Sequence, residues 1–262
     1  MHEFMYGVDS TLISLMLFLS LVLAIEFGYR IGKRIQKEAD EAFKAHINTI
    51  AAALLGILAL LLGFTLSLSL QRYDQRSEAV VQEANAIGTT WLRVQMLPAA
   101  LQEPVRAQLR GYVDLRVQTS AQDADHAASR TALATRAAQA QAALWAQAVQ
   151  AAETAPGPIT GLFVQSLNEM FDAQGARDAA LARHVPEFVL LLLYVTFLLA
   201  GAIVGYSAGV AGHRASFVTY LMVALIVVLV FVILDLDRPS RGVIQVSQKS
   251  MTDLQAGIKP AR

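Results

Sequence analysis

Cysteine is absent from the 262 residues, and this absence removes several kinds of chemistry. Without thiols the chain has no disulfide, no thiolate nucleophile and no cysteine ligand for zinc. The net charge is zero and the sequence pI is about 7.0, so no long-range positive field favours nucleic acid. We therefore expect no nucleic-acid partner and no thiol chemistry.

Paired metal ligands and phosphate-binding loops are also missing. No two histidines are three or four residues apart, the spacing at which they bind one metal ion from a helix. The five histidines are His2, His46, His126, His184 and His213. Glycine-rich loops of the Walker or dinucleotide type do not occur. The residues at 205–209 match the Gly-x-Ser-x-Gly motif of hydrolases, but an apolar helical segment precedes them where a strand is needed. We expect no catalytic residue, no metal and no cofactor, and hence no enzyme.

Charge is scarce and unevenly spread along the chain. Charged residues make up 16% of the sequence and hydrophobic residues 55%, which is unusual for a soluble protein. The apolar surplus lies in four blocks, at 10–25, 50–70, 188–211 and 215–234. A helix of about 20 such residues crosses a hydrocarbon core of about 30 Å. The pattern predicts an all-α integral membrane protein with four transmembrane helices in a lipid bilayer.

The rest of the chain is polar but helix-favouring. Apolar residues recur at helical spacing between the second and third blocks, and the run 121–152 is rich in alanine and glutamine. We expect transmembrane helices one and two within 1–70, a helical soluble domain at 71–186 and helices three and four within 187–236. A polar tail follows at 237–262.

The second apolar block continues without a proline or turn signal into Gln71 and the charged residues after it. This continuity predicts one long helix that leaves the membrane and enters the soluble domain. If the helix lines an axis, Ile57, Leu60 and Phe64 are candidates for an apolar constriction that gates by dewetting. The alternative is ordinary contact with lipid or neighbouring helices.

Small residues mark expected sites of close helix packing. The third block carries glycine every four positions, and the second block carries two further glycines, giving the set Gly56, Gly63, Gly201, Gly205 and Gly209. Small residues let helix backbones approach closely in lipid.

Four charged residues follow the second and fourth blocks, at Arg72, Arg76, Asp235 and Asp237. With four spans, these ends lie on the same side of the membrane. Charges near a membrane interface pair with each other or reach water. The four residues are therefore either structural ion pairs or charges at the mouth of a pore.

Several motifs together resemble the bestrophins. Leu62-Gly63-Phe64 followed by Arg72-Tyr73 is similar to the second bestrophin span, where a glycine-phenylalanine pair precedes an arginine and an aromatic residue. The large helical domain between spans two and three is also similar. With the segments 83–89 and 235–239, the chain most closely resembles a bacterial bestrophin-like membrane protein family.

The resemblance implies a homo-oligomeric ion channel for inorganic ions, pentameric in bestrophins, with the second spans around the pore. The bestrophin neck ends in the phenylalanine that matches Phe64. Leu60 precedes it by one turn, but Gly56 stands two turns before it, where bestrophins have a bulky residue. The acidic calcium-binding run of bestrophins is missing after the fourth span.

A second function is also open from the sequence. The alanine- and glutamine-rich run offers a thin apolar face, which suits packing against a partner better than chemistry. The chain would then be a membrane-anchored sensor or scaffold whose helical domain binds a protein.

Basic residues follow the first span and none precedes it; they are Arg30, Lys33, Arg34, Lys37 and Lys44. By the positive-inside rule this connector is cytoplasmic, which puts the soluble domain outside. Bestrophins place the corresponding domain in the cytosol. We expect a multi-pass protein of the bacterial inner (plasma) membrane, with the charge argument favouring a soluble domain on the outer side.

Overall fold

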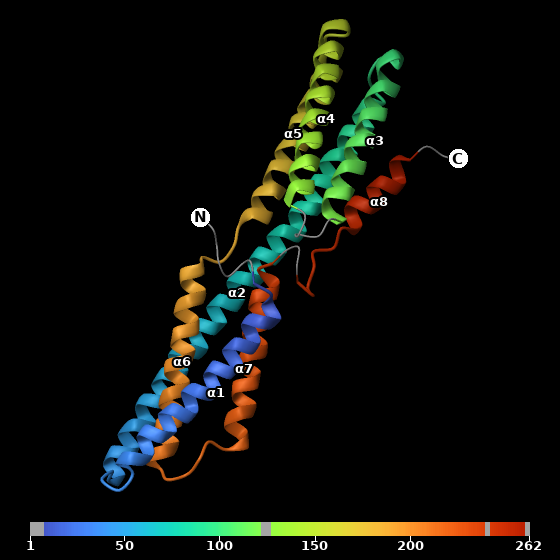
Figure 1. The fold of residues 1–262 in the computed structure, drawn as a ribbon. Coiled ribbons are helices and arrows are strands. Elements are labelled where there is room, and N and C mark those ends of the chain that lie inside the picture. Colours follow the sequence, from blue (N-terminus) through green and yellow to red (C-terminus); the bar gives the residue numbers. More distant parts are fainter. Residues whose placement is uncertain (1–7, 122–126, 239–241, 260–262) are drawn as a thin grey trace. The chain divides into compact units, whose positions relative to one another are not determined.

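The computed structural model describes residues 8–121, 127–238 and 242–259, and the regular elements in these ranges are all helices (Figure 1). They are α1 (Ser10–Ile35), α2 (Glu41–Val94), α3 (Ala99–Ala121), α4 (Ala127–Thr154), α5 (Pro158–Ala182), α6 (Glu187–Val210), α7 (Phe217–Leu236) and α8 (Lys249–Ile258). Four stretches containing α1, α2, α6 and α7 are long and apolar enough to cross a membrane. The predicted all-α membrane protein with four spans is confirmed.

The chain forms two compact units. Within the described residues, the first unit takes the chain up to Gln71, then His184–Arg238 and Gly242–Ile244. The second takes Arg72–Arg183 and the chain from Gln245 onward. Pro239, the last residue of the segment 235–239 that carries the bestrophin resemblance, lies outside the described residues. Helix α2 is continuous through the boundary at Gln71, so the predicted long helix is confirmed.

Helices α1 and α6 of the first unit touch backbone to backbone. A methyl group at Gly205 would lie 2.7 Å from the carbonyl carbon of Ile25 and still closer to its oxygen. At Gly209 a methyl group would meet the backbone of Tyr29, and at Gly28 that of Ala202. Glycine is the residue that permits this approach because it has no Cβ. In lipid, such close packing replaces the hydrophobic drive that joins helices in water.

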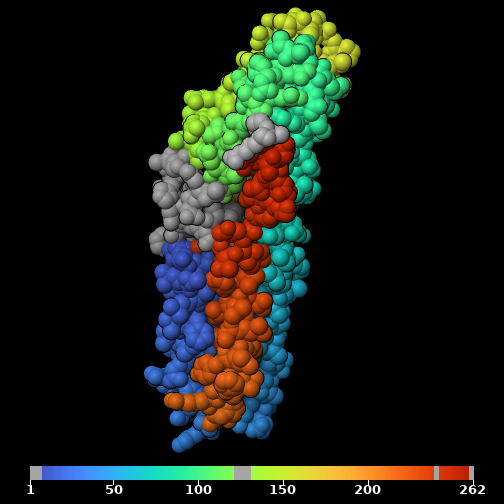
Figure 2. All heavy atoms as spheres, turned by 90° about the vertical axis from the view of Figure 1, so that its right-hand side faces the viewer, coloured from blue at the N-terminus to red at the C-terminus, as the bar shows by residue number. Residues whose placement is uncertain are grey.

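Apolar side chains complete the first unit. Figure 2 shows α7 on one face, with α1 on one side of it and the first part of α2 on the other. The buried cluster draws on all four helices and includes Leu17, Ile25, Leu58, Leu62, Leu193, Phe197, Val230 and Ile233. Ser20 and Tyr194 share a hydrogen bond of 2.8 Å between α1 and α6.

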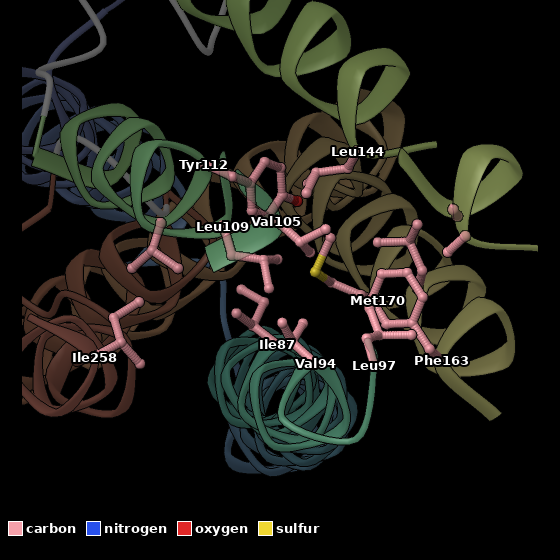
Figure 3. Close-up of a cluster of buried hydrophobic side chains, with 14 of the residues drawn as sticks. Ile87, Val94, Leu97, Val105, Leu109, Tyr112, Leu144, Phe163, Met170 and Ile258 are labelled. Atoms are coloured by element: carbon pink, nitrogen blue, oxygen red, sulfur yellow. The ribbon is translucent and has the colours of Figure 1, made fainter. Parts of the chain in front are cut away.

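The second unit has a conventional apolar core (Figure 3). Side chains from α2, α3, α4 and α5 converge there, among them Ile87, Val94, Leu109, Tyr112, Leu144, Phe163 and Met170. Each is essentially inaccessible to water. Helix α5 begins at Pro158, a residue suited to the first helical turn because it lacks an N–H that would go unpaired.

The sequence did not predict helix α8. It joins the second unit through Met251 and Ile258, both buried in the apolar core. The side chain of Gln255 donates a hydrogen bond of 2.7 Å to Asp114 on α3.

Replacing Gly205 by alanine tests the backbone contact between α1 and α6. The added methyl group collides with backbone atoms of Ile25, which have no rotamer to change. We expect a loss of roughly 3 kcal/mol in unfolding free energy, at the upper end of overpacking effects. Thermal unfolding in detergent, followed by far-UV circular dichroism, measures it. Gly175→Ala is the control, because nothing lies within 4 Å of its added carbon, and it should not lower stability. Equal stability of the two variants would contradict the contact.

Candidate functional site on the long helix

One face of α2 is buried along the whole helix. In the first unit the stripe includes Leu58, Leu62, Thr65 and Ser69, and in the second it continues through Arg76, Val80, Glu83, Ile87, Thr90 and Val94. Steps of three, four or seven residues keep these positions on one side of a helix. Thr90 donates a hydrogen bond of 3.0 Å to the carbonyl of Ser166, which joins α2 to α5 within the second unit.

The opposite face of α2 is exposed in the first unit. Phe64 is 67% exposed and Leu60 is 60% exposed, one helical turn apart. Ile57, at the edge of this face, is 57% exposed. A carbon atom added at Gly56 or Gly63 would have no neighbour within 4 Å. The chain thus leaves a mixed surface of large and small apolar residues uncovered.

The exposed face becomes polar where α2 enters the second unit. The exposed residues in register with Leu60 are then Gln71, Asp74, Glu78, Gln82 and Asn85. The amide of Gln82 donates a hydrogen bond of 3.0 Å to Glu78 one turn earlier. A single helical face therefore carries apolar groups in the membrane and water-binding groups beyond it.

Arg76 does not lie on this exposed face. Its guanidinium is buried in the second unit and donates to the carbonyls of Ala180, at 3.3 Å, and Arg183, at 2.8 Å. These carbonyls are at the C-terminal end of α5, where the helix dipole favours a positive charge. Arg72, one turn earlier, is partly exposed.

Asp235 and Asp237 are buried in the first unit and accept backbone hydrogen bonds there. The carboxylate of Asp235 accepts from the N–H groups of Val243, at 3.0 Å, and Ile244, at 2.7 Å. Asp237 accepts from the N–H of Val185 at 2.9 Å. The structure places these aspartates in one unit and Arg72 and Arg76 in the other, and their pairing stays a prediction.

A buried ionic network that no local sequence pattern predicts links three helices of the second unit. Glu83 of α2 is completely buried and accepts from Arg116 of α3 at 2.5 Å and from Arg177 of α5 at 2.6 Å. Arg116 also reaches Asp178 at 3.2 Å. Two arginines thus face two carboxylates, so the charges balance. Burial alone would lower the pKa of Arg116, but the hydrogen bond and charge of Glu83 reverse this and raise it.

Tyr112 lies beside this network. Its hydroxyl donates a hydrogen bond of 2.8 Å to Gln174, and Gln141 donates to the same oxygen of Gln174. Burial, followed by the negative charge of Glu83, raises the pKa of the Tyr112 phenol well above its usual value.

Reactive groups are not gathered elsewhere in the described chain. Its histidine, aspartate and glutamate side chains form no group of three that could hold a metal ion. Ser207, from the hydrolase-like motif, lies inside helix α6 and donates a hydrogen bond of 2.5 Å to Asn48. A helix interior is not the strand-to-helix turn that a nucleophilic serine requires.

Four apolar spans and a helical second unit define an integral membrane protein. Residues 5–251 match the family profile described as Bestrophin-like domain. The match covers nearly the whole chain, so the protein belongs to the bestrophin-like family, as the motifs predicted. No curated protein sequence matches the chain.

Solved structures share the fold. A crystal structure of a bacterial bestrophin homolog from Klebsiella pneumoniae, carrying a point mutation, gives a TM-score of 0.66 at 18% identity, covering 94% of this chain and 96% of that chain. A second mutant structure of a bacterial bestrophin homolog from that organism gives 0.65 at 15% identity, covering 92% and 96%. A structure described as a membrane protein gives 0.62 at 16% identity, covering 93% and 97%.

Replacing Glu83 by glutamine should destabilise the second unit by roughly 3–5 kcal/mol, because buried guanidinium groups lose a charged partner. Both tryptophans of the chain, Trp91 and Trp145, lie in this unit, so their fluorescence during chemical unfolding reports on it. Glu169→Gln is the matched control, since Glu169 is exposed on α5. If the Glu83 and Glu169 variants unfold at the same denaturant concentration, the network does not contribute to the stability of the second unit.

The raised pKa of Tyr112 predicts a pH-dependent stability difference from Tyr112→Phe. The folded state holds the phenolic proton more tightly than the unfolded state. The stabilisation is therefore complete below the unfolded pKa of about 10 and declines as pH rises above it. At about pH 8 the variant should be less stable by about 1 kcal/mol, from the lost hydrogen bond. Thermal unfolding across about pH 8–11 should show the gap narrowing; a constant gap would refute the prediction.

Proposed function

We propose that the chain assembles as a homo-oligomer in which the exposed face of α2 surrounds an axial path for inorganic ions. The observation that carries this proposal is the uncovered face of α2, which changes from apolar to polar along one helical register. Membership of the bestrophin-like family supports the same function.

Leu60 and Phe64 are the proposed constriction. Their side chains project from the same face one turn apart, and both are more than half exposed. Rings of such groups around an axis form a narrow apolar passage, which gates by excluding water. Ile57 flanks the face, while Gly56 leaves a wider ring one turn before Leu60. Gly56 and Gly63 are also proposed sites where a neighbouring subunit approaches.

The polar part of the face suits a water-filled path. From Gln71 to Asn85 the exposed residues in register with Leu60 are amides and carboxylates, which hold water and ions without closing the passage. Arg72, partly exposed near the start of this part, is the proposed charge at the pore mouth. Arg76, Asp235 and Asp237 have internal hydrogen bonds and would act there only as supports.

A second candidate function rests on helix α4. Residues 137–152 carry no charge, and their exposed positions include Trp145 and Val149. An uncharged exposed face suits packing against another protein. In this alternative the second unit is a sensor or scaffold that binds a protein partner, and the membrane helices are an anchor.

A conductance measurement distinguishes the channel from the scaffold. The full-length protein, purified and reconstituted in planar bilayers, should conduct ions. Phe64→Ala removes a ring of aromatic side chains from the constriction and should raise the unitary conductance severalfold. Phe188→Ala is the matched control, because Phe188 is an exposed aromatic residue on α6 and not on the proposed pore helix α2.

Cross-linking in native-like membranes complements this measurement. A closed ring of subunits is required for an axial path and is unnecessary for an anchor. Silent bilayers from intact oligomers, or equal conductance of the Phe64 and Phe188 variants, would count against the channel. A monomer that captures a protein through α4 would favour the scaffold.

A further inference from the structure

The end of α1, the start of α2 and the α6–α7 connector lie together at one end of the first unit (Figure 1). These segments are rich in basic residues. Four of them have no ion pair among the described residues: Lys33, Arg34, Lys37 and Arg214. The connector turns at Gly212, which has a φ of 85° and packs against the side chain of Gln36 at the end of α1. This turn brings the connector beside α1.

Two of these cations meet at one aromatic ring. The ammonium of Lys33 lies 5.9 Å from the ring centre of Tyr29, and the guanidinium of Arg214 lies 5.6 Å from it. Both distances are within the range of cation–π attraction. The two cations come from different elements, α1 and the α6–α7 connector, so the fold assembles this group.

Nearby acids are fewer than the basic residues at this end. Six basic residues, Arg30, Lys33, Arg34, Lys37, Lys44 and Arg214, stand against the four acids Glu26, Glu38, Asp40 and Glu41. Glu26 forms a 2.8 Å ion pair with Arg30 and also attracts Arg214 at longer range, and Glu41 forms an ion pair with Lys44. The carboxylate of Asp40 accepts the backbone N–H of Phe43 at the start of α2. Positive charge is therefore left over at this end, and an anion would stabilise the neighbouring cations.

The group follows the apolar part of α1 along the helix axis. Phe27 is exposed on α1, and at 1.5 Å per residue Lys33 lies roughly 9 Å further along the helix axis. Phe217, at the start of α7, is also exposed just after Arg214 in sequence. Both phenylalanines add exposed apolar surface, and tyrosines such as Tyr29 are enriched at the membrane–water interface. Charge and exposed aromatic surface together fit a ligand that is both anionic and lipidic.

We infer that Tyr29, Lys33 and Arg214 bind the phosphate of an anionic phospholipid headgroup. A guanidinium offers two parallel donors to phosphate oxygens, and the ammonium adds a compact charge. Arg34 and Lys37 raise the local positive potential. This site is independent of ion conduction and would hold a lipid whether or not a pore forms.

The test uses the full chain in nanodiscs of phosphatidylcholine and phosphatidylglycerol in equal amounts. After extraction, native mass spectrometry counts the lipids that remain bound. The wild type should retain phosphatidylglycerol in preference to phosphatidylcholine. The double variant Lys33→Gln/Arg214→Gln should retain on the order of tenfold less phosphatidylglycerol, because two cations at the surface are lost.

Arg136→Gln/Lys259→Gln is the matched control, since it removes two exposed positive charges from the second unit. It should retain phosphatidylglycerol as the wild type does. Circular dichroism and gel filtration check that both variants keep their helices and assembly. No lipid preference in the wild type, or equal retention by the Lys33/Arg214 variant, would overturn the proposal.

A second arm separates lipid from soluble phosphate. Inorganic phosphate is titrated into lipid-stripped protein in detergent, and binding is measured by calorimetry. If the site binds phospholipid, inorganic phosphate should give no saturable binding heat with the wild type, and the double variant should behave in the same way. If phosphate alone binds and depends on Lys33 and Arg214, the ligand is a soluble anion and the phospholipid assignment is wrong.

Discussion

The continuity of helix α2 is the constraint on which the rest of the structure depends. Its backbone hydrogen bonds run from Glu41 to Val94, so the side-chain register set in the membrane is carried into the second unit. A break near Gln71 would leave polar backbone groups unpaired near the hydrocarbon, at a cost of several kcal/mol each. Because the helix does not break, Leu62 and Ile87 lie on the same buried side, in the cores of the first and second units.

The two units hold this helix by different physical means. Lipid tails are as apolar as leucine, so the first unit gains little from burying apolar surface and relies on close backbone packing at glycines such as Gly205. The second unit faces water and gains from an apolar core around Leu109 and Phe163. The buried carboxylate of Glu83 accepts hydrogen bonds from two guanidinium groups. These directional bonds fix α2, α3 and α5 relative to one another.

The sequence predicted the features that depend on local pattern. Four apolar blocks predicted the four spans, and the absence of breakers after Leu70 predicted the continuous helix; both are confirmed. Features that depend on distant partners could not be read in the same way. Glu83 meets its two arginines 33 and 94 positions along the chain, and nothing local marks it as buried. Helix α8 is short and polar apart from Met251 and a few apolar neighbours, so its docking depends on a surface that other helices build.

Burial also explains which predicted site residues remain available for function. The carboxylate of Asp235 accepts hydrogen bonds from two backbone N–H groups inside the first unit. The guanidinium of Arg76 donates to a backbone carbonyl inside the second unit. Both charged groups are therefore engaged in internal contacts. Leu60 and Phe64 have no such internal role, since both side chains are exposed on the first unit. Gly56 and Gly63 lie on the same side with open space around them, which in lipid is where another helix approaches. The uncovered face of α2 is therefore what remains once the chain has satisfied its own packing and charges, and further subunits around an axis would use large and small residues of that face together.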